Sequence, residues 1–368
     1  MIGRAQAVGS GALEERDTGA WDDFVTRSDP GSYLQLSGWA AVKAVNGWAA
    51  VRLAAEDPAT PIGAQVLLQR PRPLPWAFAY APRGPVAATW SPDAIDGFTD
   101  IVRQQLGSGP GRASHLRIDP EIELDGPLDP DGEVRRSLRR AGWRPASPIQ
   151  PETTRIIDLR DDEVALWGGL RKKWRQYVNR ARSLGYRVVD AGTERLPEFY
   201  SIYRETARRA GFLIRTEQAY RDVWDAYRPA GLARLLLAVD PDGTAQAALF
   251  LTRCGPRVVE PYGGMTATGA HARANYLLKW EALRMSREQG ATSYDLWGLA
   301  SPGIAQFKTG FGGREIRYIG AWDLVLDPLG RAAFETAQSS RVWLARRRHG
   351  LSDRGRSAVS SDADGPGG

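Results

Sequence analysis

The chain has 368 residues, 42% hydrophobic and 25% charged, which is typical of an ordered protein too long for one hydrophobic core, so we expect two domains. It has no run of about 18 apolar residues and no hydrophobic signal core at its start, so we expect a cytoplasmic protein without a membrane-spanning helix. The single Cys254 and three scattered histidines favour neither disulfide nor metal chemistry, and the net charge of +6 favours an anionic partner: a nucleic acid, a phosphorylated metabolite or the inner face of a membrane.

Two regions predict the same succession of strands. Each has a short apolar run, a turn rich in Asp, Pro and Gly, a second apolar run and a Tyr before a Gly, which indicates an antiparallel meander. The runs lie at 52–57, 61–68 and 79–84 in the first copy and at 234–240, 243–250 and 261–264 in the second. A duplicated α/β unit explains both copies, and coincidence between two ordinary hairpins is the alternative.

Between the meanders, residues 163–184 predict one amphipathic helix that ends at Gly185. Its apolar face comprises Trp167, Leu170, Trp174, Tyr177 and Ala181. An adjoining flank carries Arg171, Arg175 and Arg182, with Lys172 further round. Such a basic ridge suits a phosphodiester backbone, and a merely solvated helix face is the alternative.

A second helix is expected at 275–289, followed by a strand at 293–297 that leads into a glycine-rich loop with Lys308. Only five of the 49 Lys and Arg residues are lysines, at positions 43, 172, 173, 279 and 308. A lysine retained against this bias is expected where a compact ammonium on a flexible stem is needed. Lys308 lies between two aromatic residues and is the leading candidate for a positioned charge; a chance surface lysine is the alternative.

The C-terminal region has little to bury. Residues 351–368 are rich in Ser, Asp, Gly and Arg and predict a disordered tail. The segment 341–349 (RVWLARRRH) suits an anionic membrane surface or RNA, and an ordinary basic helix end is the alternative.

Six short motifs follow one another along the chain: 80–85 (YAPRGP), 117–120 (RIDP), 150–159 (QPETTRIIDL), 171–181 (RKKWRQYVNRA), 294–298 (YDLWG) and 307–313 (FKTGFGG). Over residues 20–330 their order and spacing resemble the FemABX family. Members of this family are aminoacyl-tRNA-dependent peptidyltransferases, which add amino acids to the stem peptide of peptidoglycan precursors.

The resemblance implies an α/β fold of two tandem acetyltransferase-like (GNAT-type) domains, each a mixed sheet flanked by helices. The expected domains are 16–155 with 314–345, and 156–313. No long heptad hairpin is inserted, so the chain is similar to the short members without a coiled coil. Acyl-CoA relatives bind a pyrophosphate on an R-x-x-G-x-G/A loop, and the corresponding stretch 263–270 (GGMTATGA) lacks this pattern. Acetyl-CoA is therefore disfavoured, and the turn either faces another ligand or is purely structural.

The resemblance also implies site residues. Phe307 and Lys308 match the catalytic loop of the family, where the Lys308 ammonium would stabilise the tetrahedral intermediate at the tRNA acceptor end. The residues implied to bind the precursor are Lys43, which would meet a diphosphate, and Tyr80, Arg83, Arg215, Tyr220 and Tyr262. The tRNA would contact Arg171, Lys172, Arg175 and Arg182.

Two aspartates allow different readings. Asp119 matches a family motif, either as the general base for an amine that begins as an ammonium or as a turn cap before Pro120. Asp295 lies in a predicted strand before Gly298, where a buried acid is expected to serve a hydrogen-bond network.

The expected activity is transfer of an amino acid from an aminoacyl-tRNA to an amine of the stem peptide of a UDP-linked or lipid-linked muropeptide precursor. The enzyme would be a monomer without a cofactor that contacts the inner membrane face peripherally. One alternative is an acyl-CoA-dependent or tRNA-dependent N-acyltransferase acting on a polysaccharide or a secondary metabolite. Another is a non-enzymatic RNA-binding module, which the lack of interleaved aromatic and basic motifs disfavours. The amino acid and the acceptor position stay open.

Overall fold

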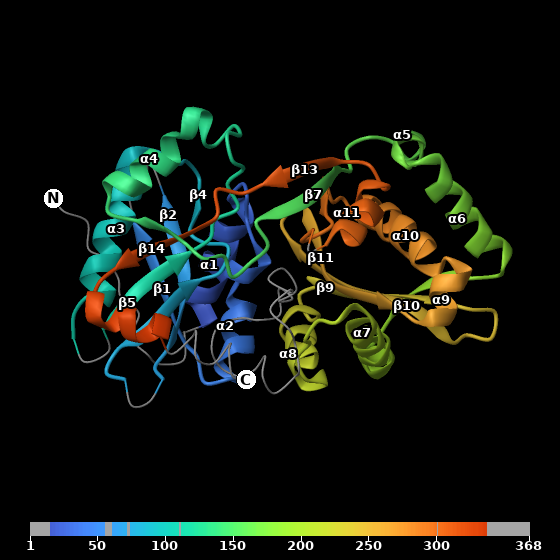
Figure 1. Cartoon of the computed structure of the whole chain (residues 1–368), viewed down its shortest axis with the longest axis horizontal. Coiled ribbons are helices and arrows are strands. Elements are labelled where there is room, and N and C mark those ends of the chain that lie inside the picture. Colours follow the sequence, from blue (N-terminus) through green and yellow to red (C-terminus); the bar gives the residue numbers. More distant parts are fainter. Residues whose placement is uncertain (1–14, 56–60, 72–73, 110–111, 300, 337–368) are drawn as a thin grey trace. The chain divides into compact units, whose positions relative to one another are not determined.

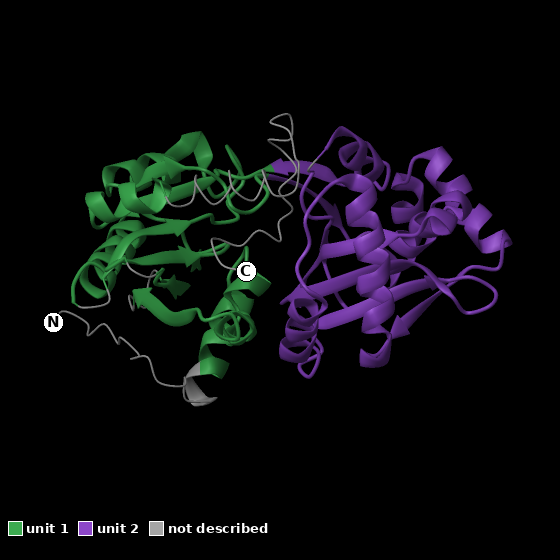
Figure 2. Cartoon of the chain, turned by 60° about the horizontal axis from the view of Figure 1, so that its bottom comes forward, with its two compact units in different colours: residues 1–152, 317–355, 364–368 green, residues 153–316, 356–363 purple. Residues whose placement is uncertain are grey.

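The structure, a computed structural model, describes residues 15–55, 61–71, 74–109, 112–299 and 301–336. The basic segment 341–349 and the tail 351–368 lie outside these residues and remain predictions. The described chain forms two compact units (Figure 2). Unit 1 holds the chain up to Glu152 and again from Arg317, and unit 2 is Thr153–Ile316.

Among the described residues, unit 1 contains a mixed seven-stranded sheet with helices packed against it (Figure 1). Its strands are β1 (Ala49–Ala55), β2 (Ile62–Gln69), β3 (Ala77–Ala81), β4 (Val86–Ala87), β5 (Ala113–Ile118), β6 (Arg144–Ala146) and β14 (Ala321–Val325). Its helices are α1 (Glu15–Arg27), α2 (Ser37–Ala44), α3 (Pro92–Leu106) and α4 (Glu133–Arg140), with a further helical segment at 328–336. The strand order is β1-β2-β3-β5-β14-β6, with β4 paired to β2. β3 and β5 run parallel, whereas the other pairs are antiparallel.

The central strands of unit 1 are apolar runs because both of their faces are covered. Every residue of β3 and of β5 is buried. Helix α3 begins where the Ser91 hydroxyl accepts a hydrogen bond from the amide of Ala94 at 3.1 Å, with a proline in the first turn. Phe98 and Val102 of α3 then join the core formed by the sheet.

The described part of unit 2 contains a second mixed sheet of seven strands, in the order β13-β7-β12-β11-β10-β9-β8. The strands are β7 (Thr153–Asp158), β8 (Arg187–Ala191), β9 (Ala233–Val239), β10 (Ala245–Cys254), β11 (Arg257–Met265), β12 (Ser293–Asp295) and β13 (Arg314–Arg317). The helices are α5 (Glu163–Gly169), α6 (Lys172–Ser183), α7 (Leu196–Ala210), α8 (Glu217–Tyr227), α9 (Ala267–Ala272), α10 (Ala274–Glu288) and α11 (Pro302–Thr309). Here β11 and β12 run parallel, and β8 to β11 form antiparallel neighbours.

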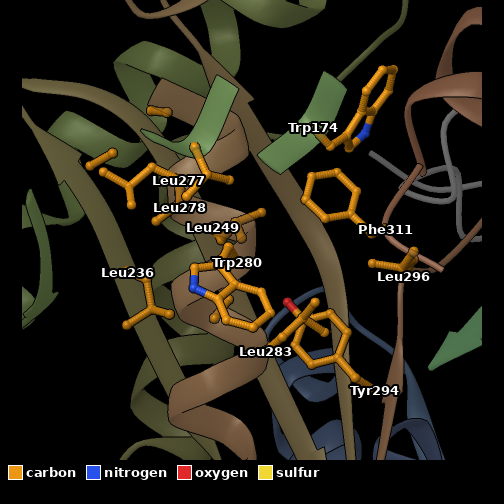
Figure 3. Close-up of a cluster of buried hydrophobic side chains, with 14 of the residues drawn as sticks. Trp174, Leu236, Leu249, Leu277, Leu278, Trp280, Leu283, Tyr294, Leu296 and Phe311 are labelled. Atoms are coloured by element: carbon orange, nitrogen blue, oxygen red, sulfur yellow. The ribbon is translucent and has the colours of Figure 1, made fainter. Parts of the chain in front are cut away.

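Helices cover both faces of the unit 2 sheet (Figure 1). Along β10, Leu249 and Leu251 belong to the core under α6 and α10, whereas Phe250 between them contacts Phe199 of α7 and Trp224 of α8. Neighbouring residues of a strand point to opposite faces, so this alternation requires an apolar cover on each side. Figure 3 shows the core on the α10 side, where leucines pack with Trp174 of α6, Trp280 of α10, Tyr294 of β12 and Phe311, which follows α11.

The two sheets confirm the predicted fold class of two acetyltransferase-like domains with mixed sheets flanked by helices. Each unit has a three-strand antiparallel meander, β1-β2-β3 or β9-β10-β11, then a crossover helix, α3 or α10, and then a strand parallel to the last strand of the meander, β5 or β12. The repeat read from the two apolar successions is therefore present at the level of topology.

The single helix predicted at 163–184 is wrong, because the chain forms α5 and α6 with a break at Leu170. Two glycines end α5, and glycine is the least favourable helix residue apart from proline. Leu170 is extended (ψ 139°) yet only 2% exposed, and the amide of Arg171 donates to the carbonyl of Gly310 at 2.9 Å instead of continuing the helix. The apolar spacing continues across the break, so periodicity alone could not detect it.

The loop predicted around Lys308 is also wrong, because Lys308 lies in the last turn of helix α11. The Ser301 hydroxyl accepts from the amide of Ile304 at 3.4 Å, and Pro302 occupies the first turn. Ser301 followed by Pro302 is the sequence signal for the start of this helix. The glycines on both sides of the helix favour a loop instead, which is why the signal was missed.

The break between α5 and α6 depends on Arg175. Its guanidinium donates to the carbonyls of Trp167, Gly168 and Leu170 at 3.3, 2.8 and 2.9 Å, which satisfies the C-terminus of α5. Arg175→Ala should lower the free energy of unfolding by about 1–3 kcal/mol, because a charged donor is lost from three carbonyls. Arg180→Ala, at an exposed position of the same helix, should change it by less than about 0.5 kcal/mol. Urea denaturation of both variants measures the difference, and equal stabilities would contradict the capping role.

Candidate functional site

The Lys308 ammonium is held by the backbone of the loop that follows β12. Lys308 is half-buried, and its Nζ donates to the carbonyl of Trp297 at 2.9 Å and to that of Gly298 at 2.8 Å. Trp297 has a φ of 57°, a left-handed conformation that is costly for a residue with a side chain. An ammonium has three donors, and no third partner of Nζ is present among the described residues, so one N–H remains for a ligand.

Charged groups beneath Lys308 tune its protonation. Burial lowers the pKa of Lys308 to about 8; the Glu260 carboxylate opposes this shift and the positive charge of Lys279 adds to it. Glu260 pairs with Lys279 and accepts a hydrogen bond from the Tyr294 hydroxyl at 2.8 Å. Burial, and then the Glu260 carboxylate, raise the pKa of Tyr294 well above its usual value. Sequence reasoning missed this buried network, although Lys279 is one of the five lysines that the composition singled out.

Phe307, the residue before Lys308, belongs to an aromatic cluster. Its ring lies 5.1 Å from Tyr276 and 5.2 Å from Phe311, and the Lys279 ammonium lies 5.5 Å from its centroid. The Phe307 carbonyl accepts from the indole of Trp174 at 3.0 Å. These contacts fix α11, and therefore the direction from which Lys308 enters the loop.

The network predicted for Asp295 is present. Asp295 is fully buried, pairs with Arg257, and accepts hydrogen bonds from the Thr154 hydroxyl and, at 2.7 Å, from the amide of Trp297. It thereby anchors the loop whose carbonyls hold Lys308.

In unit 1 the structure brings together three predicted residues: Tyr80, Arg83 and Asp119. The Asp119 carboxylate, 4% exposed, accepts from the Tyr80 hydroxyl at 2.8 Å and from the amide of Arg83 at 2.6 Å. Burial raises the pKa of Asp119 to about 6, against the opposing effect of the Arg83 charge and of these hydrogen bonds. Asp119 thus organises the turn after β3, and as a carboxylate above pH 6 it retains the chemistry of a base.

Arg83 is itself buried and held on several sides. Its Nε lies 3.3 Å from Glu121, a second nitrogen donates to the carbonyl of Pro151 at 2.8 Å, and the guanidinium lies 4.8 Å from the ring of Tyr318. Its φ of 55° places a non-glycine residue in the left-handed region, which the surrounding contacts must support. Sequence reasoning missed Glu121 and Tyr318, which no motif marks.

The remaining predicted precursor residues are placed as follows. Lys43, in the last turn of α2, is 3% exposed with its ammonium 4.9 Å from the ring of Trp39. In unit 2, half-buried Arg215 lies before α8, and its amide donates to the Tyr220 hydroxyl at 3.2 Å. The Tyr220 ring packs edge-on to Tyr262 at 5.0 Å. The substrate contacts of these residues stay predictions.

The basic ridge divides into engaged and exposed members. Arg175 caps α5, and Arg182 forms an ion pair with Glu281 at 2.8 Å. Arg171 and Lys172 at the start of α6 are exposed. The latter two are therefore the better placed for an external phosphate.

The turn between β11 and α9 is filled by the chain's own groups. The amide of Ala267 donates to the Glu205 carboxylate at 2.8 Å, and that of Gly269 donates to the Thr266 hydroxyl at 2.9 Å. A Cβ on Gly264 would collide with Thr206. The glycines therefore serve close packing, and the Glu205 carboxylate lies at the stretch expected to correspond to the pyrophosphate loop of acyl-CoA relatives.

Within the described ranges, no helix is long and apolar enough to cross a membrane. Nor does any group of three His, Cys, Asp or Glu side chains in those ranges approach the arrangement of a metal site.

The fold places this protein in the class of tandem acetyltransferase-like proteins. Comparisons with known proteins then identify its family. The model of the FemAB family matches residues 17–240 and 238–339. The crystal structure of FemX has the same fold, with a TM-score of 0.78 and 21% identity over 89% of this chain and 99% of FemX. The chain belongs to the FemAB family and is a transferase.

Two curated relatives of this chain share one name, Lipid II:glycine glycyltransferase. A Lipid II:glycine glycyltransferase of Staphylococcus saprophyticus is 24% identical over 381 residues, which cover 84% of this chain and 91% of the relative. A Lipid II:glycine glycyltransferase of Staphylococcus aureus is 30% identical over 228 residues, which cover 60% of this chain and 53% of the relative. The second match thus spans about half of that relative's length.

Because the pKa of Asp119 is raised in the folded state, we expect the free energy of unfolding to depend on pH. The carboxyl binds its proton more tightly in the folded state, so its contribution to the free energy of unfolding should fall as pH rises from about 4 to about 6. This loss should amount to about 2–3 kcal/mol and be absent from Asp119→Asn. Urea denaturation at pH 4 and pH 7 measures it, and parallel pH profiles for the two proteins would refute the assignment.

Proposed function

We propose that this FemAB-family transferase moves an amino acid from an aminoacyl-tRNA to an amine of the stem peptide of a lipid-linked peptidoglycan precursor, in the cytoplasm and at the inner membrane face. The names of the two Lipid II:glycine glycyltransferase relatives support the lipid-linked acceptor. The reaction needs no resident cofactor, because the ester of the aminoacyl-tRNA is already activated. The observation that carries the proposal is the Lys308 ammonium, which is held by two backbone carbonyls and keeps one N–H without a partner in the part of the chain that the structure describes.

The step forms a C–N bond and breaks the ester C–O bond. The amine attacks the ester carbonyl, the oxygen becomes an oxyanion, and the leaving ribose oxygen receives the proton that the amine gives up. Lys308 would donate its remaining N–H to the oxyanion, and the two backbone carbonyls hold the ammonium in place before the reaction begins. Asp119, as a carboxylate above pH 6, is the candidate to accept the proton of the starting ammonium.

The acyl-CoA alternative lacks support in the β11–α9 turn. The amides of Ala267 and Gly269 already have intramolecular acceptors, and the Glu205 carboxylate would repel a pyrophosphate. Purified enzyme given charged tRNA and lipid-linked precursor should transfer the amino acid, and RNase treatment should abolish the transfer. Activity that survives RNase and requires acyl-CoA would replace the proposal by the alternative.

Lys308→Arg should reduce turnover about 10²–10³-fold, because the planar guanidinium cannot take the ammonium position between two carbonyls. The thermal midpoint should stay close to that of the parent. In the parent, turnover should fall as pH rises through about 8, where Lys308 loses its proton. The residual activity of the arginine variant should lack this alkaline limb, and unchanged turnover would remove Lys308 from the mechanism.

The exposed start of α6 should contact RNA phosphates. The double variant Arg171→Ala/Lys172→Ala should flatten the dependence of log Kd on log salt concentration by roughly 1.5–2 units, since two phosphate contacts disappear. Arg180→Ala serves as the matched single-charge control and should leave the slope unchanged. Equal slopes for the double variant and the parent would move the tRNA site elsewhere.

A further inference from the structure

An ion pair lies buried in the core of unit 2, close to helix α11. Glu260 of β11 and Lys279 of α10 are 6% and 4% exposed and pair with each other. The second oxygen of the Glu260 carboxylate accepts a hydrogen bond from the Tyr294 hydroxyl at 2.8 Å. The Lys279 ammonium lies 5.5 Å from the ring centroid of Phe307 and 5.8 Å from that of Phe311. We call Glu260 and Lys279 the buried pair.

An irregularity of β11 turns Glu260 toward this core. Between two of its pairings with β10, β11 has two residues, Glu260 and Pro261, opposite the single Leu251. Such an extra residue is a β-bulge, and a proline, which has no N–H for a partner strand, suits it. Glu260 therefore meets α10, whereas Tyr262 packs against α8 on the other face of the sheet. Regular alternation would have placed Glu260 and Tyr262 on one face, so the bulge is what re-aims the carboxylate.

Stability alone is a weak reason for the buried pair. The core that contains it is built of apolar side chains, among them Val258 of β11 and Leu283 of α10. Two charges lose their hydration in such a core, and apolar residues of similar volume are often at least as stable there. The charges of the buried pair are therefore expected to act on a neighbouring group.

That neighbouring group is Lys308. Burial has the largest effect on the pKa of Lys308 and lowers it, and the Glu260 carboxylate is the largest effect in the opposite direction. Lys279 on α10 lowers this pKa and Asp295 on β12 raises it, each by less than Glu260 does. The charge of Asp295 is balanced by Arg257, with which it pairs. Glu260 is thus the principal negative charge that favours the ammonium.

We propose that Glu260 keeps Lys308 in its ammonium form at neutral pH, and so acts as a positioning residue of the transfer reaction, while Lys279 limits this effect. The inference rests on the proposed function, in which Lys308 donates an N–H to the oxyanion. Lys279 holds one oxygen of the Glu260 carboxylate and Tyr294 holds the other. A direct ion pair with Lys308 would occupy the N–H that the oxyanion needs. A carboxylate held by other groups instead favours the charge of Lys308 from a distance and leaves that N–H available.

The titration of Lys308 can be measured directly, on the full chain without substrate. The chain has only five lysines, so protein labelled with carbon-13 at lysine Cε should give five side-chain signals in a proton–carbon NMR spectrum. Lys308→Arg identifies the signal of Lys308. Glu260→Gln keeps the size of the side chain and removes its charge. The titration midpoint of Lys308, about 8 in the parent, should fall by about 1 unit or more, because burial and Lys279 then act without their main opponent.

Glu281→Gln is the matched control. The Glu281 carboxylate pairs with Arg182 and Arg284 at 2.8 and 2.9 Å and is not among the charges that act on Lys308, so its removal should leave the Lys308 midpoint unchanged.

A double variant, Glu260→Gln/Lys279→Met, keeps the test decisive if the single variant does not fold. It replaces the buried pair by an uncharged pair of similar size and leaves no buried ammonium without its partner. Its Lys308 midpoint should lie between those of the parent and Glu260→Gln, because a larger raising effect and a smaller lowering effect both disappear.

Turnover should follow the charge of Lys308. In Glu260→Gln the alkaline fall of turnover should move to lower pH by the same amount as the midpoint, which reduces turnover about fivefold near pH 8 and leaves it close to that of the parent near pH 6. A residue that only supports the fold would lower turnover equally at both pH values.

An unchanged Lys308 midpoint in the folded single variant, or in the double variant if only that one folds, would overturn the proposal, and RNase-sensitive transfer would still support the proposed function. A midpoint that falls while the alkaline limb of turnover stays in place would confirm the effect of Glu260 on the charge of Lys308 and contradict the role of Lys308 in the transfer.

Discussion

The carboxylate of Asp295 accepts hydrogen bonds from the Thr154 hydroxyl and the amide of Trp297, and it pairs with Arg257. These contacts join β7, β11 and β12 to the loop that follows β12. A fully buried charge requires partners on all sides, because an unpaired carboxylate in the interior costs several kcal/mol. That requirement fixes the path of residues 295–298, and the path of these residues decides where the carbonyls that hold Lys308 can lie. The core packing of α10 and α11 then brings the lysine to them.

The two units place a carboxylate at the same topological position and use it differently. In each unit it stands at the end of the strand that runs parallel to the last meander strand: Asp119 follows β5, and Asp295 ends β12. Asp119 binds the amide of Arg83 and the hydroxyl of Tyr80, so it orders a turn that carries a buried cation. Asp295 orders a turn that presents carbonyls. Both units therefore have a buried aspartate at this position, but the turns that they order differ. One turn carries the Arg83 guanidinium, and the other presents the carbonyls that hold Lys308.

The fold could be read from the sequence where local pattern and tertiary structure agree. The two meanders and the crossover helix α10 follow from apolar runs and turn residues. The break at Leu170 could not be read from the sequence, because Leu170 at the break and Trp174 after it both stay in the core. The group that stabilises the break, Arg175, acts through carbonyls that carry no sequence signature. Helix α11 was concealed by its glycine-rich surroundings.

Among site residues, the scarcity of lysine pointed to Lys308, and the same argument extended to Lys279 would have found the network with Glu260. By contrast, the contacts of Arg83 with Glu121 and Tyr318 could not be read from the sequence, because only the fold brings these residues together.

The atoms that hold Lys308 belong to the main chain. A side-chain carboxylate in their place would neutralise the ammonium and could be deleted by one substitution, whereas carbonyls leave the full positive charge in place and accompany every amino acid. The two hydrogen bonds to Lys308 therefore do not depend on which side chains residues 297 and 298 carry, as long as the backbone keeps its path. Substitutions around the lysine should consequently act through the path of the loop, and not by removing a group that neutralises the charge.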